Sequence, residues 1–156
     1  MIVVLVGGCS TSKPASPTAP AVPGQPKLIV FAAASLKKTF TDIGERFKTD
    51  HPGGVEFSFA GSPDLVSQLS QGAQADVFAS ADTKNMDKAA KAGLVAGDPV
   101  NFASNTLTIA VAPGNPKHLA ALRDLTQPGV SVVICAAPVP CGSATQKVEQ
   151  ASGVQL

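Results

Sequence analysis

Two serines stand where strand-like segments give way to helix-like ones. Ser35 follows the apolar, β-branched run at 28–33, and Ser62 follows a second such run at 55–60. A helix N-terminus has unpaired backbone N–H groups and the positive end of the helix dipole, so it attracts anions. Two converging serine-tipped helix starts therefore predict an oxyanion site that needs no lysine or arginine. A helix cap alone would also explain either serine.

The elements that must position these serines alternate along the chain. Strands are predicted over 28–33, 55–60, 76–80, 106–112 and 130–134, with a short one over 101–103, and helices over 35–49, from Ser62 to Gly72, from Asp82 or Thr83 to Gly93, over 118–125 and over 142–151. Ser62, followed by Pro63 and Asp64, is the predicted N-cap of its helix. This order is typical of a parallel α/β sheet, whose ligands lie beyond the carboxyl ends of the strands.

Small and acidic residues surround the two junctions. Ala34 and Gly61 precede the serines and either let a ligand approach the backbone or simply pack tightly. Asp76 and Asp82 are predicted to hold a strand end and a helix cap, because a dianion site would repel carboxylates.

Composition narrows the class of function. Among 156 residues, 12 Lys+Arg stand against 11 Asp+Glu, so charge gives no reason to expect nucleic acid as a partner. The chain has no Trp or Tyr, which argues against a site for sugars or stacked bases. It also lacks the G-x-S-x-G elbow of serine hydrolases and the G-x-G-x-x-G loop of dinucleotide enzymes. We therefore expect a binding protein and no enzyme.

The first residues are similar to a bacterial lipoprotein signal. An apolar run over 1–9 ends in Gly-Gly-Cys, with Cys9 as the lipidation site, although the charged start is missing and the run is short. Residues 10–26 carry a proline at every third position, which predicts a polyproline spacer or a solvated tail. We therefore expect an extracytoplasmic protein that a lipid anchors to the cell membrane, in the periplasm or at the cell surface. The alternative is that the apolar run over 1–9 arose by chance and is no signal.

Two cysteines lie close together near the last predicted helix. In an exported protein Cys135 and Cys141 either pair in a disulfide or remain free thiols. A metal site is not expected, because no third ligand lies nearby in the sequence.

Four segments resemble the periplasmic molybdate-binding proteins of ABC transporters, at 30–36, 59–65, 72–82 and 105–113. The resemblance implies an α/β, type 2 periplasmic-binding-protein-like fold, a two-lobed clamshell with the second lobe incomplete. The first lobe would span 27–104 and the partial second lobe 105–156, because the family continues well beyond the position of Leu156. This implies a truncated chain.

The resemblance also implies a ligand shell. Ser35 and Ser62 would donate hydroxyl hydrogen bonds to molybdate or tungstate, and Cys141 stands where the family offers a backbone N–H. Ala34 and Gly61 are the further candidate ligands, whereas the tyrosine of the family has no counterpart here. No cofactor is implied besides this ligand, and the expected partner of the monomer is an ABC permease. A binder of sulfate or another oxyanion, or a truncated surface lipoprotein that binds nothing, are the alternatives.

Overall fold

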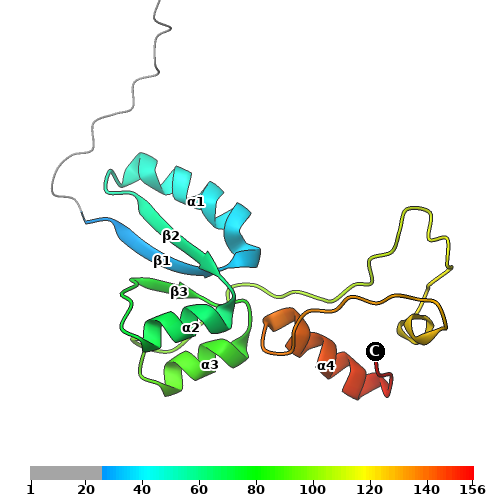
Figure 1. Ribbon diagram of the computed structural model, residues 1–156. Coiled ribbons are helices and arrows are strands. Elements are labelled where there is room, and N and C mark those ends of the chain that lie inside the picture. The colour runs from blue at the N-terminus through cyan, green and yellow to red at the C-terminus, as the bar shows by residue number, and fades with distance from the viewer. Residues whose placement is uncertain (1–25) are drawn as a thin grey trace, which may run out of the picture.

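A computed structural model describes residues 26–156 (Figure 1). Its elements are β1 (Leu28–Ala33), the 3-10 turn η1 (Ala34–Leu36), α1 (Lys37–Asp50), β2 (Val55–Ala60), α2 (Ser62–Ser70), β3 (Val77–Ala79), α3 (Thr83–Lys91), the 3-10 turn η2 (Leu122–Thr126) and α4 (Pro140–Ser152). The predicted signal, the lipidation of Cys9 and nearly all of the proline-rich stretch lie outside the described residues.

The three strands form one parallel sheet in the order β2-β1-β3. The chain steps from β1 to β2 in one direction and from β2 across β1 to β3 in the other. Because crossovers between parallel strands are right-handed, these opposite steps place the connecting helices on opposite faces of the sheet. Figure 1 shows this arrangement, with α1 over one face and α2 and α3 over the other. The predicted parallel α/β sheet is confirmed.

The core lies around the central strand. Val30, Phe31 and Ala32 of β1 are buried, and Leu65 and Val66 of α2 are almost fully excluded from solvent against the sheet. On the other face α1 approaches β2 closely, since a Cβ at Gly44 would lie 2.5 Å from Cε2 of Phe57. The apolar residues that the sequence pattern places on the inner faces of these elements are therefore buried. Their packing fixes where the carboxyl end of each strand lies.

The strands predicted at 101–103, 106–112 and 130–134 are absent. The segment 106–112 keeps an alternating apolar pattern, but Leu107, Ile109 and Val111 remain 38–48% exposed. With residues 130–134 it lines one open hollow of about 990 Å³. Neither segment has a hydrogen-bonded neighbouring strand in the part of the chain that the structure describes, and an extended segment becomes a strand only when its backbone groups are paired.

The helix predicted at 118–125 is reduced to the short turn η2. Asn115 explains the difference, because its side chain accepts from the Leu119 N–H and donates to the Leu119 carbonyl, both at 3.0 Å. This local pairing competes with the helix. His118, within the loop that the Asn115 side chain closes, has a positive φ of 53°. Within η2, the carboxylate of Asp124 accepts from two backbone N–H groups, which lowers its pKa.

The remaining predicted helices are present, and α4 begins at Pro140 with a proline in its first turn. Within residues 26–156, none of the helices has the length and apolar character required of a membrane span.

Candidate functional site

The two serines follow the carboxyl ends of two neighbouring strands. In the parallel register Ala33 of β1 is paired with Ala60 of β2, and each serine follows its strand end by the same number of residues. Neighbouring strands are about 4.8 Å apart. Ser35 and Ser62 therefore stand together at the carboxyl edge of the sheet, where the sequence predicted them.

Ser62 does not cap its own helix, so the predicted N-cap is wrong. Gly61 is the N-cap residue and Ser62 is the first residue of α2, with only 1% of its surface exposed. Its Oγ accepts a hydrogen bond from the backbone N–H of Ala81 at 3.0 Å. Its hydroxyl donates no hydrogen bond among the described residues. Ser62 thus has an engaged oxygen and a proton left to donate.

Ser35 lies in η1, directly before α1, and its side chain is exposed. It makes no capping hydrogen bond in either element. A role as a helix cap therefore does not explain Ser35, and its hydroxyl is open to solvent at the edge where Ser62 lies.

The edge next to β1 is the topological switch point of this sheet. Crossovers leave β1 in opposite directions, and ligands of doubly wound sheets bind in the crevice beyond such a strand. The bond between Ser62 and Ala81 joins the residues that follow the two outer strands, so it reaches across the end of β1. All three strand-to-helix junctions thus meet here, together with exposed Ala34 and half-buried Gly61.

The two aspartates have the structural roles that the sequence predicts. Asp76 accepts from the N–H of Ile29 at 2.7 Å, at the opposite edge of the sheet. Asp82 is the N-cap of α3 and accepts from the N–H of Asn85 at 2.9 Å. No group of three or more His, Cys, Asp or Glu side chains converges on a metal position within 26–156.

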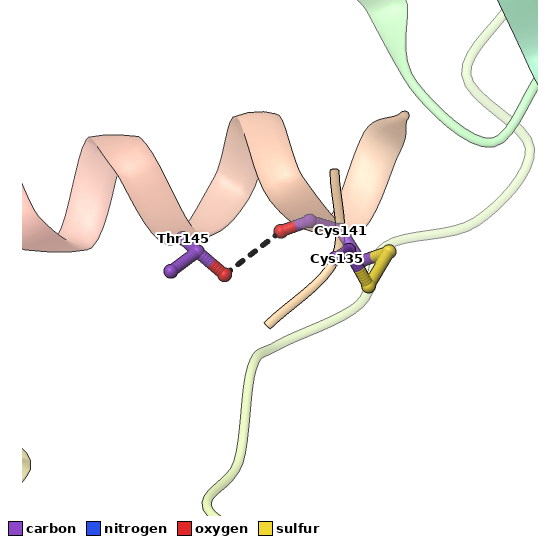
Figure 2. Close-up of a disulfide and its surroundings, with 3 residues drawn as sticks. All are labelled: Cys135, Cys141 and Thr145. Carbon is purple, nitrogen blue, oxygen red and sulfur yellow. Dashed lines mark hydrogen bonds between the residues drawn. A yellow bond between two sulfur atoms is a disulfide. The ribbon is translucent and has the colours of Figure 1, made fainter. Parts of the chain in front are cut away.

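Cys141 lies on a separate segment, in the first turn of α4. Figure 2 shows its disulfide to Cys135 and the hydroxyl of Thr145, which donates to the Cys141 carbonyl at 3.0 Å. Gly142 fits there because a Cβ would collide with the carbonyl of Ala136. The N-terminus of α4 is the end nearer the sheet in Figure 1, but no hydrogen bond joins Cys141 to Ser35 or Ser62 in the described chain.

Sequence reasoning missed Ser143, in the same first turn. Its side chain is 8% exposed, and its hydroxyl forms no hydrogen bond within residues 26–156. The predicted helix over 142–151 already places Ser143 in its first turn, so the position was predicted and only the hydroxyl was overlooked. The signal that would have identified it is Pro140, which marks the first turn of a helix.

Reducing the disulfide is expected to loosen the first turn of α4. The bond links residues separated by 6 positions, and the loss of such a constraint costs about 2 kcal/mol in the chain-entropy account. Hydrogen exchange of the α4 amides should therefore accelerate in dithiothreitol, while the β1 amides serve as the internal control. Equal protection of α4 with and without the reductant would contradict this expectation.

Comparisons with known proteins found a family model, curated relatives and a solved structure. Residues 28–155 match the family of bacterial extracellular solute-binding proteins. The whole chain is 54% identical to the molybdate-binding protein ModA of Mycobacterium tuberculosis H37Rv and spans 60% of the length of that relative. ModA of Escherichia coli K12 is 49% identical over 63 residues, which are 40% of this chain and 24% of that relative. A substrate-binding domain assigned to a molybdenum ABC transporter of Clostridium difficile is 33% identical, with a TM-score of 0.40 over 42% of this chain and 29% of that structure.

Proposed function

The chain belongs to the bacterial extracellular solute-binding proteins, and we propose that it captures molybdate, or tungstate, for an ABC importer. The resemblance predicted from the four sequence segments is confirmed, as is the α/β fold with a parallel sheet. The observation that carries the proposal is the buried Ser62, which presents a proton without an acceptor at the carboxyl edge.

The chemistry of molybdate suits such a site. Near neutral pH the ion is fully deprotonated, so its oxygens only accept hydrogen bonds. Ser35 and Ser62 offer hydroxyl donors, and the helix starts behind them add N–H groups with partial positive charge. Hydrogen bonds to a charged group contribute roughly 1.5–3 kcal/mol each, so a few of them supply the ~8 kcal/mol of a micromolar complex.

Phosphate is disfavoured by the same arrangement. It usually keeps a proton near neutral pH, and this proton needs an acceptor in the site. Asp76 lies at the opposite edge, and both carboxylate oxygens of Asp82 accept from Asn85. Asp64, in the first turn of α2, is the carboxylate nearest to Gly61, but its side chain is exposed to solvent. The acceptor-only anions molybdate, tungstate and sulfate are therefore the favoured ligand class.

The proposal extends to the second half of the ligand shell. The Cys141 amide would complete it from the second lobe (105–156), with the first lobe at 27–104 and Ala34 and Gly61 lining the approach. Delivery would be to a permease, by a monomer held to the membrane through lipidated Cys9. The position of α4 supports this placement, because Lys147 of α4 lines a pocket of about 560 Å³ with residues of α3.

A thermal melt of the 156-residue chain, followed by circular dichroism, tests the proposal. A ligand that binds only the folded state raises the melting temperature. Molybdate should raise it and phosphate should leave it unchanged. An equal rise with sulfate would instead indicate a general oxyanion binder. A cooperative melt that molybdate does not move would overturn the proposal and favour a surface lipoprotein without this ligand.

A further inference from the structure

A chain of hydrogen bonds runs from the N-terminus of α3 to Ser62. The Asp82 carboxylate accepts from the backbone N–H of Asn85 at 2.9 Å and from its side-chain amide at 2.9 and 3.1 Å. Ser80 Oγ donates to the Asp82 carbonyl at 2.9 Å. Between these two residues, the N–H of Ala81 donates to Ser62 Oγ at 3.0 Å. The turn at 80–82 is thus closed around the amide that contacts Ser62.

The residues at both ends of this series of hydrogen bonds are shielded from water. Ser62 is 1% exposed and Asn85 5% exposed. Hydrogen bonds in such surroundings are stronger than in water, and breaking one leaves a polar group that water cannot easily satisfy. Ala81 itself is exposed, but the turn that carries it is tied to the buried Asn85, so the Ala81 amide is held in place and holds the oxygen of Ser62.

A serine hydroxyl has one proton and two lone pairs. Because Ala81 fills one lone pair, the position of the Ser62 oxygen is fixed and its proton turns away from the amide. We propose that Asp82, together with Asn85, is a positioning residue that presents the Ser62 hydroxyl as a hydrogen-bond donor to a fully deprotonated oxyanion. This inference rests on the proposed function. It adds that two residues that do not contact the anion orient the Ser62 hydroxyl and so favour a fully deprotonated oxyanion.

Charge and position give opposite expectations for Asp82. If its negative charge were its main influence, every neutral replacement would strengthen the binding of a dianion. If it positions Ser62, alanine weakens binding because the cap is lost, whereas asparagine preserves binding because its amide oxygen caps a helix about as well. Two variants of the same residue therefore separate the two influences.

The test is calorimetric titration of the 156-residue chain and its variants with sodium molybdate. Asp82→Ala should raise the dissociation constant on the order of 10-fold, and Asp82→Asn should keep it within about 3-fold of the wild type. The matched control is Asp76→Ala, which removes a carboxylate that accepts a backbone N–H at the other end of β3. Wild-type affinity in Asp82→Ala, or an equal loss in Asp76→Ala, would overturn the inference.

The Ala81 amide gives a readout that a merely structural role would not move. When Ser62 donates to an anion its oxygen becomes a better acceptor, so the Ala81 amide proton should shift downfield with molybdate in the wild type and in Asp82→Asn. No shift would overturn the inference. A folded wild type that leaves molybdate unbound overturns the proposed function instead. In that case the hydrogen-exchange rate of the Ala81 amide still tests the positioning role of Asp82. The rate should rise in Asp82→Ala, and an unchanged rate would overturn that role.

Discussion

Replacing Ser62 with alanine is expected to raise the dissociation constant for molybdate about 10- to 100-fold. The variant removes a donor to a charged ligand and also leaves the N–H of Ala81 without its partner. Because Ser62 is only 1% exposed, water does not easily replace its hydroxyl. Calorimetric titration measures the loss directly, and the molybdate-induced rise in melting temperature should shrink with it.

The matched control for this variant is Ser70→Ala. Ser70 lies at the other end of α2, and its hydroxyl donates to the Val66 carbonyl at 2.8 Å, within the helix. The same substitution there removes a hydroxyl from the same helix without touching the proposed site. If Ser62→Ala bound molybdate like the wild type, or if Ser70→Ala lost as much affinity, Ser62 would not be a ligand.

Replacing Leu65 with alanine is expected to lower the free energy of unfolding by about 2–5 kcal/mol. Leu65 is fully buried in α2, a helix that packs against β1 and α3, so the shortened side chain leaves a cavity beneath the helix that begins with Ser62. Small domains are stable by only about 5–15 kcal/mol. Urea unfolding followed by circular dichroism should therefore show a midpoint far below that of the wild type.

Leu107→Ala is the control for this loss, because Leu107 is 48% exposed on a segment without a strand partner. It should shift the unfolding midpoint little. Similar losses in the two variants would mean that α2 is not held to the sheet through Leu65. Since Leu65 does not lie at the carboxyl edge, Leu65→Ala should still bind molybdate at temperatures where it is folded.

Local signals were enough to predict the first half of the fold. The apolar runs at 28–33 and 55–60 form β1 and β2, and Asp82 caps α3 as predicted. Each of these elements depends on side chains a few residues apart, so a single sequence contains the information. Their order then places both serines at one edge of the sheet, because the carboxyl ends of parallel strands share an edge.

The second half shows where such signals fail. Residues 106–112 have the alternation of a strand, but a strand also needs a hydrogen-bonded neighbour, and periodicity says nothing about where that neighbour lies. Likewise, the apolar positions near His118 suggest a helix, whereas the Asn115 side chain binds the backbone of Leu119 and prevents it.

The site was predictable only in part for a related reason. The position of Ser62 beside Ser35 follows from the order of strands and helices. The partner of Ser62 is a backbone N–H from a residue 19 positions away, and a backbone group leaves no signature in the residue types. The sequence therefore predicts that Ser62 caps its own helix, whereas its oxygen accepts from the backbone N–H of Ala81, at the junction between β3 and α3.

The central claim is that an oxyanion binds at the carboxyl edge beside β1. It is tested most directly by following the backbone amide resonances of the 156-residue chain while molybdate is added. We predict saturable shifts concentrated at residues 34–36, 61–64 and 80–82, with the β1 amides near Leu28 unmoved. An absence of shifts at a millimolar excess of molybdate, or shifts centred away from these junctions, would contradict the claim.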